Sequence, residues 1–168
     1  MNAPEILKEG TYALEDVETL KKKAELVNDI YPLQLKELFE IQNPAKIFDT
    51  DFKKEQQDFC KERQKEADTR GDWIYFSWSK TLIHSVSEDD LYELRTNRNK
   101  KIITPKEQEV LRGKTIGLLG MSVGSNVGLN LIYAGTGSTF KLADFDTLDT
   151  TNLNRVRARL DQIGTNKV

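Results

Sequence analysis

The chain has very little cysteine and histidine, with one residue of each, Cys60 and His84, among 168. A single thiol cannot form an internal disulfide, and one thiol and one imidazole are too few ligands for a structural zinc site. We therefore assign no metal-ligating residue. We do not expect a catalytic or metal-binding role for His84, because no second histidine or cysteine is near it, and we do not assign Cys60 as a nucleophile.

The chain also lacks a long apolar run and an excess of positive charge. It has no stretch of about 18 apolar residues that would predict a membrane-spanning helix. Its N-terminus has no basic segment followed by an apolar one, which argues against a signal peptide. The net charge is -2 and the pI is about 5.6, so no basic field indicates nucleic acid. We expect a cytoplasmic protein with no nucleic-acid or membrane partner.

The first two thirds of the chain contain helical and β-hairpin patterns. Apolar residues at three- and four-residue steps predict helix over residues 14–41, with Pro32 either breaking the pattern or starting a second helix. The charged segment 51–70 predicts a solvated helix that packs one thin apolar stripe. Two β-prone runs, 73–78 and 81–86, flank a short polar connection and predict a hairpin whose aromatic residues are core.

Two helix starts are marked by capping residues. Ser87 precedes three acidic residues and predicts an N-cap. Thr104, Pro105 and Glu107 form a capping-box pattern, and Gly113 predicts the end of that helix.

The last third of the chain predicts a β-α-β unit. Residues 115–120 are typical of a buried parallel strand, a helix is expected from about Asn126 to Ala134, and a second strand over 140–143 ends at Asp144. A glycine loop at the first strand-to-helix turn directs backbone N–H groups and a helix N-terminus toward a phosphate. The carboxylate at the end of the second strand is placed to bond ribose hydroxyls.

Together these patterns predict an α/β protein. A helical and hairpin-containing region over residues 1–112 is followed by an incomplete Rossmann-like nucleotide-binding unit over 113–168. The glycines of the loop, Gly120 and Gly124, are four residues apart and fall one residue short of G-x-G-x-x-G. Taken alone, this glycine spacing is a weak signal. It is compatible with a phosphate-binding loop and also with a tight turn that binds no ligand.

The residues after the second predicted strand carry a more specific pattern. They are Asp144, Asp146, Asn152, Asn154, Arg155, Gly164, Lys167 and Val168. In order and spacing they resemble the D-x-D-x(5)-N-L-x-R and G-x-x-K-V signatures of the ThiF/MoeB and ubiquitin-activating-enzyme-like adenylyltransferases. The resemblance covers residues 113–168. The sequences of residues 142–148 and 152–155 are also similar to those of bacterial ThiF-like proteins that carry a nitroreductase-like domain further along the chain.

The resemblance implies binding of ATP and transfer of AMP to a carboxylate, usually the C-terminal glycine of a ubiquitin-like or sulfur-carrier protein. It implies that Asp144 binds the ribose, that Asn152 and Arg155 meet the phosphates, and that Lys167 offsets charge as pyrophosphate leaves. The residues it implies for nucleotide binding are Gly120, Gly124, Ser125, Asp144, Asp146, Asn152 and Asn154. Those it implies for catalysis are Arg98, Arg155 and Lys167.

Three further expectations follow from the same resemblance. Arg95-Thr-Asn-Arg98 is similar to an R-x-x-R motif whose arginine reaches the ATP of a partner subunit, so Arg98 either acts in trans in a homodimer or is plain surface charge. The family's magnesium-binding aspartate is expected beyond residue 168. We therefore expect a truncated domain with little adenylylation activity by itself.

Two other functions fit the β-α-β pattern. A NAD- or FAD-binding Rossmann oxidoreductase fragment has the same strand, loop, helix and terminal carboxylate. The segment Asn152 to Arg155 favours ATP over a dinucleotide, because it supplies phosphate-binding residues after the second strand. The remaining alternative is a non-enzymatic module in which residues 1–112 bind a partner and the nucleotide fold is a remnant.

Overall fold

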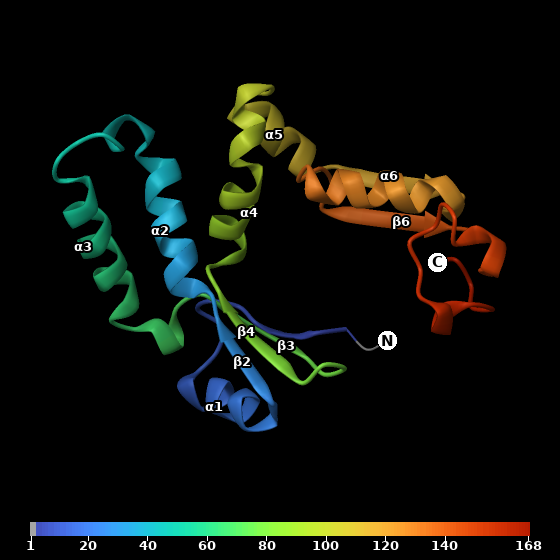
Figure 1. Cartoon of the computed structure of the whole chain (residues 1–168), viewed down its shortest axis with the longest axis horizontal. Coiled ribbons are helices and arrows are strands. Elements are labelled where there is room, and N and C mark those ends of the chain that lie inside the picture. The colour runs from blue at the N-terminus through green and yellow to red at the C-terminus, as the bar shows by residue number, and fades with distance from the viewer. Residues whose placement is uncertain (1–2) are drawn as a thin grey trace. The chain divides into compact units, whose positions relative to one another are not determined.

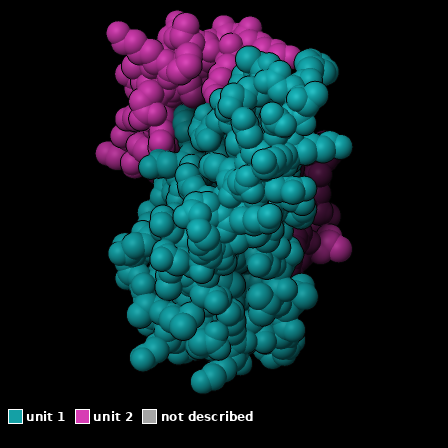
Figure 2. Space-filling view, turned by 90° about the vertical axis from the view of Figure 1, so that its left-hand side faces the viewer, with its two compact units in different colours: residues 1–97 teal, residues 98–168 magenta. Residues whose placement is uncertain are grey.

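The structure is a computed structural model that describes residues 3–168. The chain divides into two units, residues 1–97 and 98–168 (Figure 2). Within the described residues, no helix is both long enough and apolar enough to cross a bilayer.

The first unit is built on a four-stranded mixed sheet (Figure 1). Its strands are β1 (Glu5–Leu7), β2 (Leu26–Asp29), β3 (Asp72–Phe76) and β4 (Thr81–Ser85), in the order β1-β3-β4-β2. β3 and β4 are antiparallel and are joined by the short polar turn, so the predicted hairpin is confirmed. β1 adds to β3 in the antiparallel sense, and β2 adds to β4 in the parallel sense.

The helical pattern predicted over residues 14–41 is wrong for residues 24–30, whereas Pro32 does lie in the first turn of a second helix, which was one of the two alternatives. The structure has helix α1 (Leu14–Lys23), then strand β2, then helix α2 (Tyr31–Gln42). Val27 of β2 lies opposite Leu82 of β4, and the Ile30 N–H donates to the His84 carbonyl. The strand forms because a distant partner offers these backbone groups hydrogen bonds, which outweigh a local preference of a few tenths of a kcal/mol per residue.

Helix α1 covers one face of this sheet. Val17 and Leu20 are buried on α1 and pack with three residues of β3 and β4, which are Trp73, Tyr75 and Leu82. Because successive side chains of a strand alternate between faces, Trp73 and Tyr75 point to the same side and meet the helix together. Trp73 and Tyr75 are thus core, as predicted, whereas Trp78 at the turn of the hairpin is 49% exposed, so the prediction is wrong for that residue.

A second core joins the remaining helices of this unit. α2, α3 (Phe52–Gln64) and α4 (Glu88–Thr96) enclose buried residues that include Leu35 and Cys60. α3 buries only Phe52 and Cys60, which confirms the thin apolar stripe. The Ser87 hydroxyl accepts a hydrogen bond from the Asp90 N–H at the start of α4, so the predicted N-cap is confirmed.

The second unit begins with a short 3₁₀ turn and helix α5 (Pro105–Arg112). The predicted capping box is present, with Thr104 and Glu107 bonded to each other's backbone N–H, and the helix ends at Gly113. The Gln108 side chain donates to the carbonyls of Ala134 and Gly135. These contacts tie α5 to the segment that follows it in the chain, within the compact unit of residues 98–168.

The remainder of this unit is a parallel strand pair with a connecting helix. β5 (Thr115–Leu119) and β6 (Thr139–Ala143) pair in parallel, and α6 (Met121–Tyr133) lies between them in sequence. Gly128 lets the helix approach the strand, because a Cβ there would lie 2.7 Å from the Leu118 Cδ1 atom. The predicted start of this helix near Asn126 is wrong. α6 begins five residues earlier, directly after Gly120, so Gly120 to Gly124 do not form an open loop.

Candidate functional site

The polar residues of the sequence motif in the second unit gather near the carboxyl ends of β5 and β6. The two strand ends are joined by a hydrogen bond from the Gly120 N–H to the Ala143 carbonyl, 2.8 Å long. An open hollow of about 600 Å³ lies here and is lined by Leu119, Gly120, Leu142, Ala143, Asp144, Phe145 and Val168. In open α/β sheets, ligands bind outside the carboxyl ends of parallel strands.

Asp144 connects the end of β6 to the start of α6. Its Oδ2 accepts the Met121 N–H at 2.6 Å, and its Oδ1 accepts the Asp146 N–H at 2.9 Å. The Met121 hydrogen bond, followed by that from Asp146, holds the pKa of Asp144 below its ordinary value. The carboxylate is therefore ionised at neutral pH and stabilises the positive end of the helix. A carboxylate has about four lone-pair positions, so each oxygen can accept one further hydrogen bond.

Arg155 lies against the first turn of α6. Its Nε donates to the Ser122 Oγ at 3.0 Å, and its Nη1 donates to the Asn154 Oδ1 at 2.9 Å and to the Thr151 carbonyl at 3.3 Å. The Asn126 amide donates to the Arg155 carbonyl at 2.7 Å. Although 33 residues separate Arg155 from Ser122, the guanidinium is held beside the helix N-terminus.

Lys167 is paired with Asp146. The ammonium lies 2.8 Å from the Asp146 Oδ2, and the Lys167 side chain is only 8% exposed. The chain reaches this position by running back along the segment after β6: the Leu148 N–H donates to the Thr165 carbonyl, and the Lys167 N–H donates to the Asp146 carbonyl. An ammonium has three donors, so the ion pair leaves Lys167 with capacity for a second acceptor.

The remaining predicted nucleotide-binding residues have structural contacts of their own. Asn152 is buried, and its Oδ1 accepts the Asp149 N–H at 3.0 Å, which closes the turn after β6. Gly124 and Ser125 lie on α6 beyond its first three residues. The N–H groups without an intrahelical acceptor are those of the first turn, so Ser122 and Val123 carry the donors that remain after Met121 bonds Asp144.

Arg98 is not brought to this group within the chain. Its neighbour Asn99 donates to the carbonyl of Ala134, at the opposite end of α6 from Gly120. With a rise of about 1.5 Å per residue, the helix separates its two ends by roughly 20 Å. The structure thus unites Asp144, Asp146, Asn154, Arg155 and Lys167 near the start of α6 and leaves Arg98 apart.

Sequence reasoning missed two residues of this group, Ser122 and Asn126. The sequence gives only a weak indication of their role. Both are polar residues, four positions apart, in a segment rich in glycine, leucine and valine. Residues four apart lie on one helix face. This spacing is meaningful only on a helix, and the sequence pattern predicted a loop over residues 121–125.

The charge of the second unit is opposite to that of the first. Residues 98–168 contain 11 Lys and Arg and 6 Asp and Glu, a net charge of +5, whereas residues 1–97 contain 14 and 21, a net charge of -7. The near-zero charge of the whole chain conceals this difference. A positive unit favours anionic ligands over neutral ones.

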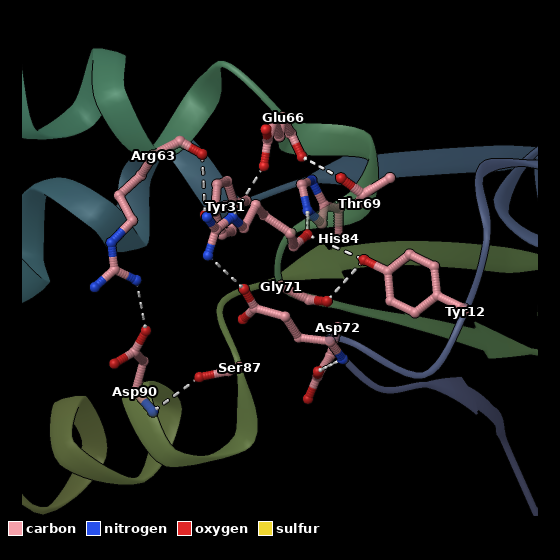
Figure 3. Close-up of polar contacts among 12 residues, drawn as sticks. Tyr12, Tyr31, Arg63, Glu66, Thr69, Gly71, Asp72, His84, Ser87 and Asp90 are labelled. Atoms are coloured by element: carbon pink, nitrogen blue, oxygen red, sulfur yellow. Dashed lines mark hydrogen bonds and ion pairs between the residues drawn. The ribbon is translucent and has the colours of Figure 1, made fainter.

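A second polar cluster lies in the first unit, around His84 (Figure 3). His84 is 1% exposed, with its Nδ1 2.9 Å from the Asp29 Oδ1 and its Nε2 2.9 Å from the Arg70 carbonyl oxygen. Its ring is stacked between the rings of Tyr31 and Trp73. The Tyr12 hydroxyl donates to the Gly71 carbonyl nearby, and burial is the main cause that raises the pKa of Tyr12 to about 12.

This cluster around His84 is a packed structural network. His84 itself is buried in the core of the first unit. Across residues 3–168, no three His, Cys, Asp or Glu side chains come together as a group that could hold a metal ion.

The comparisons with known proteins add one relative. The chain is 34% identical over 95 residues to an uncharacterized protein of Mycobacterium tuberculosis (strain CDC 1551 / Oshkosh). The match covers 56% of this chain but only 13% of the length of the relative. No protein-family model matches the chain, and no solved structure matches it significantly. The name of the relative specifies no activity.

Proposed function

We propose that residues 98–168 form the nucleotide-binding part of an ATP-dependent adenylyltransferase that acts in the cytoplasm. The observation that carries the proposal is the position of Arg155, whose guanidinium is held at the first turn of α6 by the Ser122 hydroxyl. A helix N-terminus and a forked cation at one point suit a phosphate group, because both supply N–H donors and positive potential.

Two further features support ATP as the ligand. Lys167 supplies a second cation, paired with Asp146 just after the carboxyl end of β6. The residues of this unit carry a net charge of +5, which favours a highly charged triphosphate. Asp144, ionised and anchored by the Met121 N–H, can accept a hydrogen bond from a ribose hydroxyl at the mouth of the hollow.

The proposed reaction joins a carboxylate to AMP. A carboxylate oxygen attacks the α-phosphorus of ATP, the bond from that phosphorus to the bridging oxygen breaks, and pyrophosphate leaves. Arg155 and Lys167 would stabilise the negative charge that grows on the leaving oxygens. The carboxylate that we propose is the C-terminus of a ubiquitin-like or sulfur-carrier protein, by resemblance of the motifs around Asn152 and Lys167.

Calorimetric titration of the full chain with ATP, with and without magnesium, tests the binding step. We expect ATP to bind, NAD to bind at least tenfold more weakly, and Arg155→Ala to weaken ATP binding by roughly 10- to 100-fold, as for loss of a charge-assisted hydrogen bond. Arg157→Ala is the matched control, since Arg157 is an exposed arginine two residues away. Equal losses in both variants would point to general charge and against a phosphate site at Arg155.

A further inference from the structure

Two side chains of α6 hold Arg155 from two directions. The Ser122 hydroxyl accepts from the Arg155 Nε at 3.0 Å, and the Asn126 amide donates to the Arg155 main-chain carbonyl at 2.7 Å. Because Ser122 and Asn126 stand four residues apart on the helix, they lie on the same face. One contact orients the guanidinium and the other anchors the backbone that carries it.

The contacts leave one edge of the guanidinium available. Nε is used by Ser122, and Nη1 is used by the Asn154 Oδ1 and the Thr151 carbonyl. Nη2 takes part in none of these bonds, and Arg155 is exposed. A guanidinium has five N–H donors in a fixed plane, so holding Nε and Nη1 also fixes the direction of Nη2.

We propose that Ser122 and Asn126 are positioning residues that hold Arg155 at the first turn of α6 before a phosphate binds. This rests on the nucleotide-binding function proposed above. A free arginine side chain has many rotamers, and selecting one of them in advance lowers the entropic cost of binding. Ser122 acts through the hydroxyl, so threonine can replace it, whereas alanine cannot.

Titration of the full chain with ATP gives the expected pattern of affinities. Ser122→Ala and Asn126→Ala should each weaken ATP binding by roughly 5- to 10-fold, the size of one lost hydrogen bond. Ser122→Thr should stay within about twofold of the wild type, because it keeps the acceptor. Asn130→Ala and Ser138→Ala are controls, since both residues are exposed and neither bonds the Arg155 side chain or its carbonyl. Those hydrogen bonds are made by Ser122, Asn126, Thr151 and Asn154.

A double-mutant cycle separates positioning from direct contact. If Ser122 acts through Arg155, Ser122→Ala should have no further effect on ATP affinity in an Arg155→Ala background. An equal loss in both backgrounds would show that Ser122 contacts the nucleotide itself, and would overturn the proposal.

An NMR measurement on the chain without nucleotide decides the question independently of ATP. The Arg155 Nε–H signal, assigned by its loss in Arg155→Lys, should exchange slowly with water in the wild type and in Ser122→Thr, and rapidly in Ser122→Ala. Unchanged exchange in Ser122→Ala would overturn the positioning role. If the wild type binds no ATP, the proposed function fails, while the exchange of this proton still shows whether Ser122 holds Arg155.

Discussion

The rings of His84 and Trp73 lie parallel, with centroids 4.1 Å apart and planes 2° apart. The two residues face each other across the β3–β4 hairpin, and Tyr31 stacks on the other side of the imidazole. His84 is thus a buried residue that pairs with β3, stacks on Tyr31 of helix α2 and makes polar contacts with Asp29 and Arg70. The stability of the first unit should depend strongly on it.

Replacing His84 should separate its stacking from its hydrogen bonds. We expect His84→Ala to lower the free energy of unfolding by about 3 kcal/mol, because a large buried ring is lost. His84→Phe should cost about 1–2 kcal/mol, because it keeps a ring but leaves the Arg70 carbonyl without its donor. Urea denaturation followed by tryptophan fluorescence measures this, since Trp73 and Trp78 both belong to the first unit.

The matched control for His84 is Phe48→Ala. Phe48 is also an aromatic residue of the first unit but is 95% exposed. Its loss should change the free energy of unfolding by less than about 0.5 kcal/mol. Equal effects at the two positions would contradict the structural role of His84.

Gly71 should tolerate no side chain. It has a φ of +72°, and a Cβ there would lie 2.2 Å from the Ser85 carbonyl oxygen. Gly71→Ala should lower the free energy of unfolding by at least about 2 kcal/mol, from backbone strain and from displacement of β4. Gly10→Ala is the control: its φ is +79° but no atom lies within 4 Å of the added carbon. A cost at Gly71 no larger than that at Gly10 would mean that the close approach to β4 is unimportant.

The parts of the fold that local chemistry controls could be predicted from the sequence. The Thr104 capping box and the Ser87 cap depend on residues three positions apart, so their signals are complete within one turn. Strand β2 could not be predicted in this way. Its partner β4 lies about 55 residues further along the chain. All four residues of β2 are exposed, so the sequence Leu-Val-Asn-Asp lacks the apolar–polar alternation of a half-buried strand.

The candidate site shows the same division. The motif residues Asp144 and Arg155 could be selected from spacing alone, but not the atoms that hold them. That Asp144 bonds the Met121 N–H depends on α6 beginning directly after Gly120, and the glycine spacing instead predicted a loop. A one-residue shorter turn allows the helix to start at once, because Gly120 adopts a positive φ of 85°.

Protonation of Asp144 should weaken the start of α6. Its pKa in the folded state lies below its ordinary value of 3.8, so the folded state binds this proton less readily than the unfolded state. The stabilisation is therefore fully present above the ordinary value and is lost as the pH falls through the lower, folded value. The Met121 amide proton, which donates to Asp144, should shift in the NMR spectrum over that acidic range. The Leu129 amide in the middle of α6 is the internal control and should not follow the same titration.

The two partners of the Lys167–Asp146 pair should differ in what their removal costs. The Lys167 side chain is 8% exposed and that of Asp146 is 51% exposed. Asp146→Ala leaves a mostly buried ammonium without its counter-charge, and should cost about 1–3 kcal/mol. Lys167→Met keeps most of the buried side-chain volume and leaves a carboxylate that water can solvate, so it should cost less than about 1 kcal/mol.

Amide hydrogen exchange at Gly164 and Lys167 measures this difference, because their N–H groups bond the segment after β6. Arg159 and Asp161 provide the matched pair, since their side chains are 61% and 63% exposed. Removing either of those two should leave the exchange rates essentially unchanged, because water solvates whichever charge remains. If Lys167→Met proved as costly as Asp146→Ala, the pair would be stabilising through its own attraction rather than through burial of the ammonium. Lys167 would then be fixed in place by Asp146 and less able to reach a phosphate.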